Sequence, residues 1–236
     1  MKDESVLLCE RCGYEIEGLA LDTNCPECGL PVRTSLPQSR PGSPLQQGGA
    51  GATWRTTMAL LKRPGRTMAD LRIEPTERAS KRMRRQFLLP GVLASLGVVL
   101  FVGIRDRSPS VMVSRLAELA GVLFGVTVAV VIVISILTHV EVVGVRFWGN
   151  RHGRRITKRI AINICAHAAC GWSVGGLLIA VGLPLGELIE HVALESNVGI
   201  LRGPFLLARY ILPAAGFFTG MLLFEFWTWK GVQANR

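Results

Sequence analysis

Two pairs of cysteines near the N-terminus have the spacing of metal ligands. Within each pair two residues separate the cysteines, and a glycine directly follows the second one; the pairs are Cys9 with Cys12 and Cys25 with Cys28. A glycine at that place permits a tight turn with positive φ, which aims both thiolates of a pair at one point. Four such thiolates form a closed tetrahedral zinc site. The sequence therefore predicts Zn²⁺ bound by these four cysteines, with two disulfides or an iron–sulfur site as the alternatives.

The predicted zinc site has a structural role, because a closed tetrathiolate site leaves no coordination position open for chemistry. Residues 1–33 contain three cations and seven acids, and four thiolates with Zn²⁺ add about −2 to that charge. Affinity for phosphate comes from Lys and Arg, so this acidic module is not expected to bind nucleic acid.

A second group of polar residues lies inside an apolar stretch. Asn163, His167 and Cys170 recur at helical spacing on one face. Polar groups in lipid are costly, so they can mark a transport path, which would make the protein a small transporter or channel using Asn163 and His167. The alternative, which we favour, is hydrogen bonding between packed helices.

A third group of residues offers catalytic chemistry at the end of another apolar stretch. His139 and Glu141 form a His-x-Glu sequence, and His152 follows in a basic loop. Together they suggest a membrane-interface enzyme. A zinc deaminase would also need a later Pro-Cys-x-x-Cys, which does not follow, and the motifs of metalloproteases, serine hydrolases and nucleotide-binding loops are absent. We therefore expect no enzymatic activity.

The elements that position these groups are expected to be membrane helices. The chain is 49% hydrophobic, its mean hydropathy is +0.36, and its apolar residues are concentrated in four long runs. About 20 apolar residues cross a bilayer as a helix. The fold expected is a mostly α four-helix transmembrane bundle with a small β-type zinc ribbon and amphipathic interfacial helices. The four runs are Phe87–Ile104, Leu119–Thr138, Ile160–Gly186 and Tyr210–Trp229.

The distribution of Lys and Arg predicts the orientation of these spans. Residues 54–86 contain ten of them and the loop between the second and third spans contains six, whereas the other loops contain few. By the positive-inside rule both termini face the cytoplasm, next to an anionic inner leaflet. That compartment is reducing, which favours a metal over disulfides.

Four domains follow from these patterns. Residues 1–33 are the zinc ribbon, residues 34–53 a flexible linker rich in Pro, Gly and Ser, residues 54–86 basic amphipathic juxtamembrane helices, and residues 87–230 the four-span domain.

The juxtamembrane region is predicted to begin with a helix that lies on the inner leaflet. Trp54, Met58 and Leu61 fall at helical spacing among basic residues, and Met68 and Leu71 are expected to continue the apolar face. The alternative to a membrane-lying helix is a solvated basic stretch, whose only effect is to set the orientation of the spans in the membrane.

Two small-xxx-small pairs lie in the third and fourth spans. They are Gly171 with Gly175 and Gly216 with Gly220. Such pairs let helix backbones approach closely in lipid, so they predict helix packing and a possible contact between two copies of the chain.

Residues 9–33 resemble the short zinc ribbons at the N-termini of many multi-pass bacterial membrane proteins of unassigned function. The cysteines of this chain match the ligands of those ribbons, and the resemblance implies a bacterial inner membrane. The order of basic N-terminal region, amphipathic helix and small-residue-rich spans also resembles the Yip family, whose members usually have five spans and act as membrane adaptors. The function expected is a non-enzymatic membrane protein whose cytoplasmic ribbon, residues 1–33, recruits or senses a protein partner.

Overall fold

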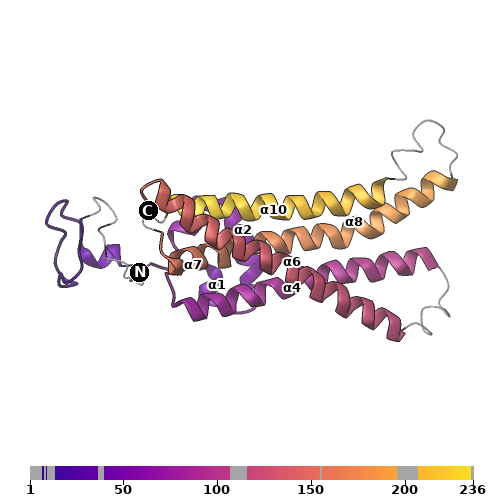
Figure 1. Cartoon of the computed structure of the whole chain (residues 1–236), viewed down its shortest axis with the longest axis horizontal. Helices are drawn as coiled ribbons and strands as arrows, with labels where there is room; N and C mark the ends of the chain where they lie inside the picture. The colour runs from indigo at the N-terminus through magenta and orange to yellow at the C-terminus, as the bar shows by residue number, and fades with distance from the viewer. Residues whose placement is uncertain are drawn as a thin grey trace. The chain divides into compact units, whose positions relative to one another are not determined.

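The computed structural model describes residues 7, 9, 14–36, 40–106, 116–154, 156–195 and 207–234. The fold is mostly α, as predicted, and in these ranges extended pairing is limited to isolated bridges, one between Asn24 and Pro31 and one at Glu15. In chain order (Figure 1) the elements are the 3₁₀-helix η1 (Val32–Ser35) and the α-helices α1 (Pro44–Gln47), α2 (Ala52–Lys62), α3 (Pro64–Ala69), α4 (Thr76–Asp106), α6 (Leu116–Arg151), α7 (Lys158–Ala168), α8 (Cys170–Glu195) and α10 (Ala208–Ala234).

Four helical segments are long and apolar enough to cross a membrane, which confirms the four apolar helices predicted from the sequence. They are Thr76–Arg105, Ala117–Arg151, Lys158–Ala193 and Ala208–Ala234. Each is longer than the apolar run that predicted it, because polar turns at the ends continue the same helices.

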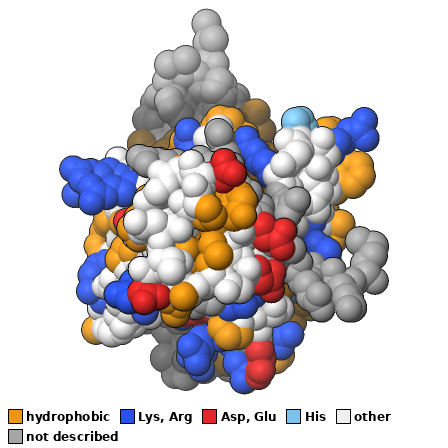
Figure 2. Space-filling view, turned by 90° about the vertical axis from the view of Figure 1, so that its left-hand side faces the viewer, with side chains coloured by type: hydrophobic (Ala, Val, Ile, Leu, Met, Phe, Trp, Pro, Cys, Tyr) orange, Lys and Arg blue, Asp and Glu red, His pale blue; other side chains and the backbone are white. Residues whose placement is uncertain are grey.

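The chain divides into two compact units, and α4, α6 and α10 contribute residues to both. The first unit is Met1–Met83, His139–Ala168 and Phe226–Arg236; the second unit is Arg84–Thr138 and Ala169–Glu225. Charged side chains of both signs, with hydrophobic ones among them, lie on the face that Figure 2 shows.

In the second unit, α8 and α10 lie side by side through the predicted glycine pairs (Figure 1). A Cβ atom added to Gly220 would lie 2.7 Å from the Cα of Gly175, and one added to Gly175 would lie 3.2 Å from the carbonyl oxygen of Gly216. These distances leave no room for a side chain, so glycine is required for this backbone approach. The pairs therefore pack within one chain; a contact between copies through them stays a prediction and would compete with this packing.

Helix α8 also packs against α4 through small residues. A Cβ atom on Gly97 would lie 2.7 Å from the Cα of Ala180, and one on Gly176 would lie 2.6 Å from the Cα of Pro90. Small residues on different sides of α8 thus admit α4 and α10, as expected for helices that associate in lipid by close packing.

In the first unit, α7 is a core helix. Every residue from Ala161 to Ala168 is buried, and the Cβ position of Gly231 on α10 is 2.5 Å from a side-chain carbon of Ile164. The predicted run Ile160–Gly186 lies within the segment Lys158–Ala193, which is long and apolar enough to cross a membrane, and Ala169 divides that segment into the buried α7 and the longer α8. A run of 27 residues is longer than one bilayer crossing needs.

Residues 40–51, which lie within the predicted linker of residues 34–53, form a short helix and several hydrogen bonds. Ser43 caps α1 in a capping box with Gln46, and the side chain of Gln46 accepts a hydrogen bond from the Arg72 backbone N–H at 3.0 Å. The Arg72 guanidinium donates to the carbonyl oxygens of Arg40, at 2.7 Å, and Pro41, at 3.0 Å. These bonds fix a segment whose composition alone indicates flexibility.

Helices α2 and α3 pack on the first unit by one side only. Leu60 and Met68 are fully buried, and so is Leu71, which follows α3. The sequence had predicted that Met68 and Leu71 continue the exposed apolar face, and this prediction is wrong. Both are core residues, so the exposed apolar face is limited to α2.

Candidate metal centre

Two hairpin turns with the same hydrogen bond position the cysteines of the N-terminal module. The backbone N–H of Cys9 donates to the carbonyl oxygen of Tyr14 at 2.7 Å, and that of Cys25 donates to Leu30 at 2.7 Å. Both bonds join a cysteine to the fifth residue after it. The two hydrogen bonds are thus equivalent and sixteen residues apart.

Each cysteine pair is also enclosed by one further backbone hydrogen bond, and these two bonds are equivalent to each other. The N–H of Ile16 donates to the carbonyl of Leu7 at 2.8 Å, and the N–H of Val32 donates to Thr23 at 2.9 Å. Ile16 and Val32 are each 2% exposed and form one small core with the cysteines. Because this core is so small, a metal is the expected source of additional stability.

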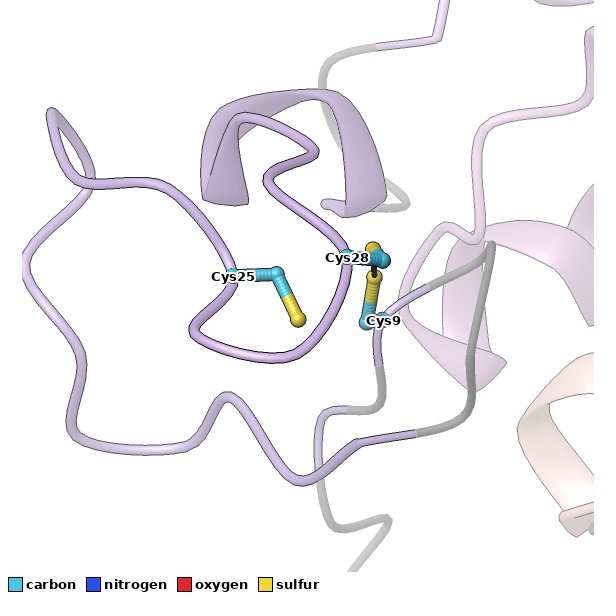
Figure 3. A group of neighbouring side chains, drawn as sticks. All are labelled: Cys9, Cys25 and Cys28. Atoms are coloured by element: carbon cyan, nitrogen blue, oxygen red, sulfur yellow. Dashed lines mark hydrogen bonds between the residues drawn. The ribbon is translucent and has the colours of Figure 1, made fainter.

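The sulfur atoms of three cysteines converge in the space between the turns (Figure 3). The Sγ atoms of Cys9, Cys25 and Cys28 all lie within 4.8 Å of one another, and those of Cys9 and Cys28 are 3.5 Å apart. A tetrahedral zinc ion with Zn–S distances of about 2.3 Å would hold its sulfurs about 3.8 Å apart. These three side chains can thus hold a metal ion with little movement. The fourth predicted ligand, Cys12, lies outside the described residues.

The turn after the second cysteine pair has the conformation that the sequence predicts. Gly29 has φ of +71°, and its N–H donates to the carbonyl of Cys25 at 2.9 Å. The left-handed conformation turns the chain directly after Cys28, and L-residues with a side chain rarely adopt it.

Among its described residues, the module exposes several acids and two large apolar side chains. Tyr14 is 39% exposed and Leu21 is 55% exposed. The exposed acids around them are Glu15, Glu17, Asp22 and Glu27.

Asn163 and His167, the proposed transport residues, are buried in the first unit, and Asn163 joins α7 to Glu74. The Asn163 side chain accepts a hydrogen bond from the Glu74 N–H at 3.2 Å and donates to the carbonyls of Glu74 and Arg159, both at 2.9 Å. His167 Nδ1 lies 2.7 Å from the Asn163 carbonyl oxygen, while Nε2 is buried without a partner. The amide of Asn163 thus bonds to Glu74, which precedes α4, and to Arg159 of its own helix, and a role of Asn163 and His167 in transport stays a prediction.

Three charged residues complete this polar core, and sequence reasoning missed them. Arg159 donates to the carbonyls of Ile73, at 2.7 Å, and Glu74, at 3.0 Å. The carboxylate of Glu74 forms an ion pair with the guanidinium of Arg82, and both side chains are largely buried. The sequence offered one signal for this ion pair. Glu74 is an acid within the strongly basic residues 54–86, and an acid in such a place has cations near it with which it can pair.

The structure does not bring His139, Glu141 and His152 together. His139 is exposed on α6, and residues two apart on a helix face different directions, so Glu141 does not face it. His152 is thirteen residues further along, about 20 Å at 1.5 Å per residue. Its Nδ1 lies 2.8 Å from the carbonyl oxygen of Trp148.

The second unit contains an apolar cavity of about 180 Å³. Trp172, Ile179 and Phe217 are among its lining residues, and none of the lining residues is titratable. The indole N–H of Trp172 donates to Thr138 at 3.2 Å, which leaves only the ring face for packing. The cavity suits hydrocarbon and offers no group for acid–base chemistry.

Comparison with protein-family models, curated proteins and solved structures finds no match for this chain. The resemblances to bacterial zinc-ribbon membrane proteins and to the Yip family thus receive no support beyond the four apolar helices and the cysteine cluster. The function must be inferred from the geometry of the chain itself.

Proposed function

We propose that the N-terminal module is a zinc ribbon in which Cys9, Cys12, Cys25 and Cys28 bind one Zn²⁺. The convergence of three thiols between two equivalent turns supports this. The offset of sixteen residues that relates Cys9 to Cys25 also relates Cys12 to Cys28, so Cys12 supplies the fourth ligand. The three described thiols of the site are not disulfide-bonded, which suits a reducing compartment.

The whole chain is proposed to be a non-enzymatic protein of the bacterial inner membrane, with both termini in the cytoplasm. Its ribbon recruits or senses a cytoplasmic protein. The observation that carries this proposal is the surface of the module, where Tyr14 and Leu21 are exposed among four exposed acids although the site itself is closed. Exposed apolar side chains surrounded by charges are typical of protein interaction sites.

Metal analysis of the full chain tests the zinc site. The protein purified in detergent is expected to contain one zinc per chain by elemental mass spectrometry. Cys25→Ser and Cys28→Ser should lose most of it, whereas Cys165→Ser, at a buried cysteine of α7, should retain it. Iron in place of zinc, or full retention of zinc in Cys25→Ser, would refute the proposed site.

Co-purification tests the recruitment role with the full chain. A variant with Glu15→Lys, Glu17→Lys and Asp22→Lys should lose its cytoplasmic partner while keeping its zinc, because these side chains are exposed and none is a ligand. A matched control reverses three exposed charges elsewhere: Arg78→Glu, Lys81→Glu and Arg151→Glu. If all three proteins recover the same partners, the ribbon does not recruit through this surface.

A further inference from the structure

We propose that the outer face of α2 is a binding surface for an anionic lipid leaflet. Most globular surface helices carry their large apolar side chains toward the core. Helix α2 differs, because only Leu60 of its large apolar side chains is fully buried and others are exposed. Trp54 is 61% exposed and Leu61 is 48% exposed, while the side that packs on the first unit contains Thr56, Thr57 and Leu60.

The exposed Trp54 and Leu61 and the half-buried Met58 form one apolar stripe on α2. At about 100° per residue, Leu61, Trp54 and Met58 fall within about 60° of one another around the helix axis. Thr56 and Leu60 fall on the opposite side, and both are fully buried. Helix α2 thus has a side that faces the protein and an apolar stripe. In that stripe, no described residue of the first unit covers Trp54 or Leu61.

Cations flank this stripe on one side and continue beyond the helix. Lys62 and Arg55 fall about 80° to 100° from Trp54, and Arg63 and Arg66 follow in the sequence. All four are exposed, and within the described part of the chain none of them forms an ion pair. The sequence has no Asp or Glu between residues 34 and 69.

An apolar stripe containing Trp and flanked by unpaired cations is complementary to an anionic bilayer surface. Trp is favoured at the level of the lipid headgroups, and each Lys or Arg near the surface adds electrostatic attraction to anionic lipid. A protein partner is less well matched, because a region of four cations without a single acid gives no mixture of charges for a protein surface to pair with. The occupant is therefore the anionic leaflet of the membrane that holds the four spans.

Photochemical crosslinking in vesicles tests this surface with the full chain. Benzoylphenylalanine is placed at position 54 or 61, and at position 21 as a control, where another exposed leucine lies in the cysteine module. The protein is reconstituted in phosphatidylcholine, alone or mixed with phosphatidylglycerol, and lipid adducts are measured by mass spectrometry. Positions 54 and 61 are expected to form adducts, with a several-fold preference for phosphatidylglycerol over phosphatidylcholine in the mixture.

A charge variant separates the anionic preference from simple contact with lipid. Lys62→Glu with Arg63→Glu and Arg66→Glu should abolish the preference for phosphatidylglycerol. Helical circular dichroism should be unchanged, because all three side chains are exposed. Absence of adducts at 54 and 61, equal yields at 21, or a preference that survives charge reversal would each overturn the proposal. Zinc content and partner recovery, which test the ribbon, are independent of these results.

Discussion

At the scale of residues, the cysteine spacing was the most informative part of the sequence. Two thiols joined by a two-residue turn can reach one point from local geometry alone, so Cys25 and Cys28 were predictable without any knowledge of the fold. The polar core of the first unit was not predictable in this way. Asn163 bonds to Glu74, which lies 89 residues away in the chain, and no local pattern encodes such a partner.

Asn163→Ala is expected to destabilise the first unit. The change removes the partner of the Glu74 N–H, whereas the Glu74 carbonyl keeps its bond from Arg159, and leaving one such backbone group unsatisfied costs about 1–3 kcal/mol. Thermal unfolding of the full chain in detergent measures the effect. As a control, Thr219→Ala removes an exposed hydroxyl that bonds only to Ala215 of its own helix, and it should have little effect. Equal melting temperatures for the two variants would contradict a structural role for Asn163.

The ion pair of Glu74 and Arg82 gives a second prediction at the residue scale. Glu74→Gln leaves the guanidinium of Arg82 without its counter-charge in a largely buried place, and breaking a buried pair costs about 3–5 kcal/mol. The same change at Glu77, which pairs with Lys81 on the surface, should cost under about 1 kcal/mol. Chemical unfolding of both variants measures the difference. A loss at Glu77 as large as the loss at Glu74 would mean that burial does not control the strength of these pairs.

At the scale of elements, hydropathy predicted that four apolar helices exist but not what surrounds each of them. Both α7, which is buried in protein, and α8 are rich in apolar residues, since lipid and a protein interior select the same side chains. The break at Ala169 and the burial of α7 depend on contacts with distant segments, such as that between Ile164 and Gly231. A run longer than one bilayer crossing was the available sign that part of it belongs to a protein core.

The glycine contacts between α8 and α10 give a prediction at the same scale. Gly220→Ala places a methyl group 2.7 Å from the Cα of Gly175, so the helices must move apart, and overpacking of this kind costs about 1–3 kcal/mol. Gly125→Ala is the matched control, because nothing lies within 4 Å of its Cβ position on α6 and alanine favours a helix by about 1 kcal/mol. Unfolding in detergent should show a loss for the first and no loss for the second. A stable Gly220→Ala would show that the two helices are not in close contact.

At the scale of the whole molecule, the distribution of charge predicts the topology more securely than any single residue does. Four spans would place both termini on one side, and the ten cations of residues 54–86 predict that this side is the cytoplasm. Alkaline phosphatase fused after residue 236 of the full chain should therefore be inactive in bacterial cells, because the enzyme needs the oxidising periplasm to form its disulfides. A fusion at residue 110, in the loop between the first two apolar runs, should be active. The reverse pattern would place the cysteine module in an oxidising compartment, where disulfides displace zinc and no cytoplasmic partner is accessible. Activity of both fusions would instead show an odd number of crossings, which four spans do not permit.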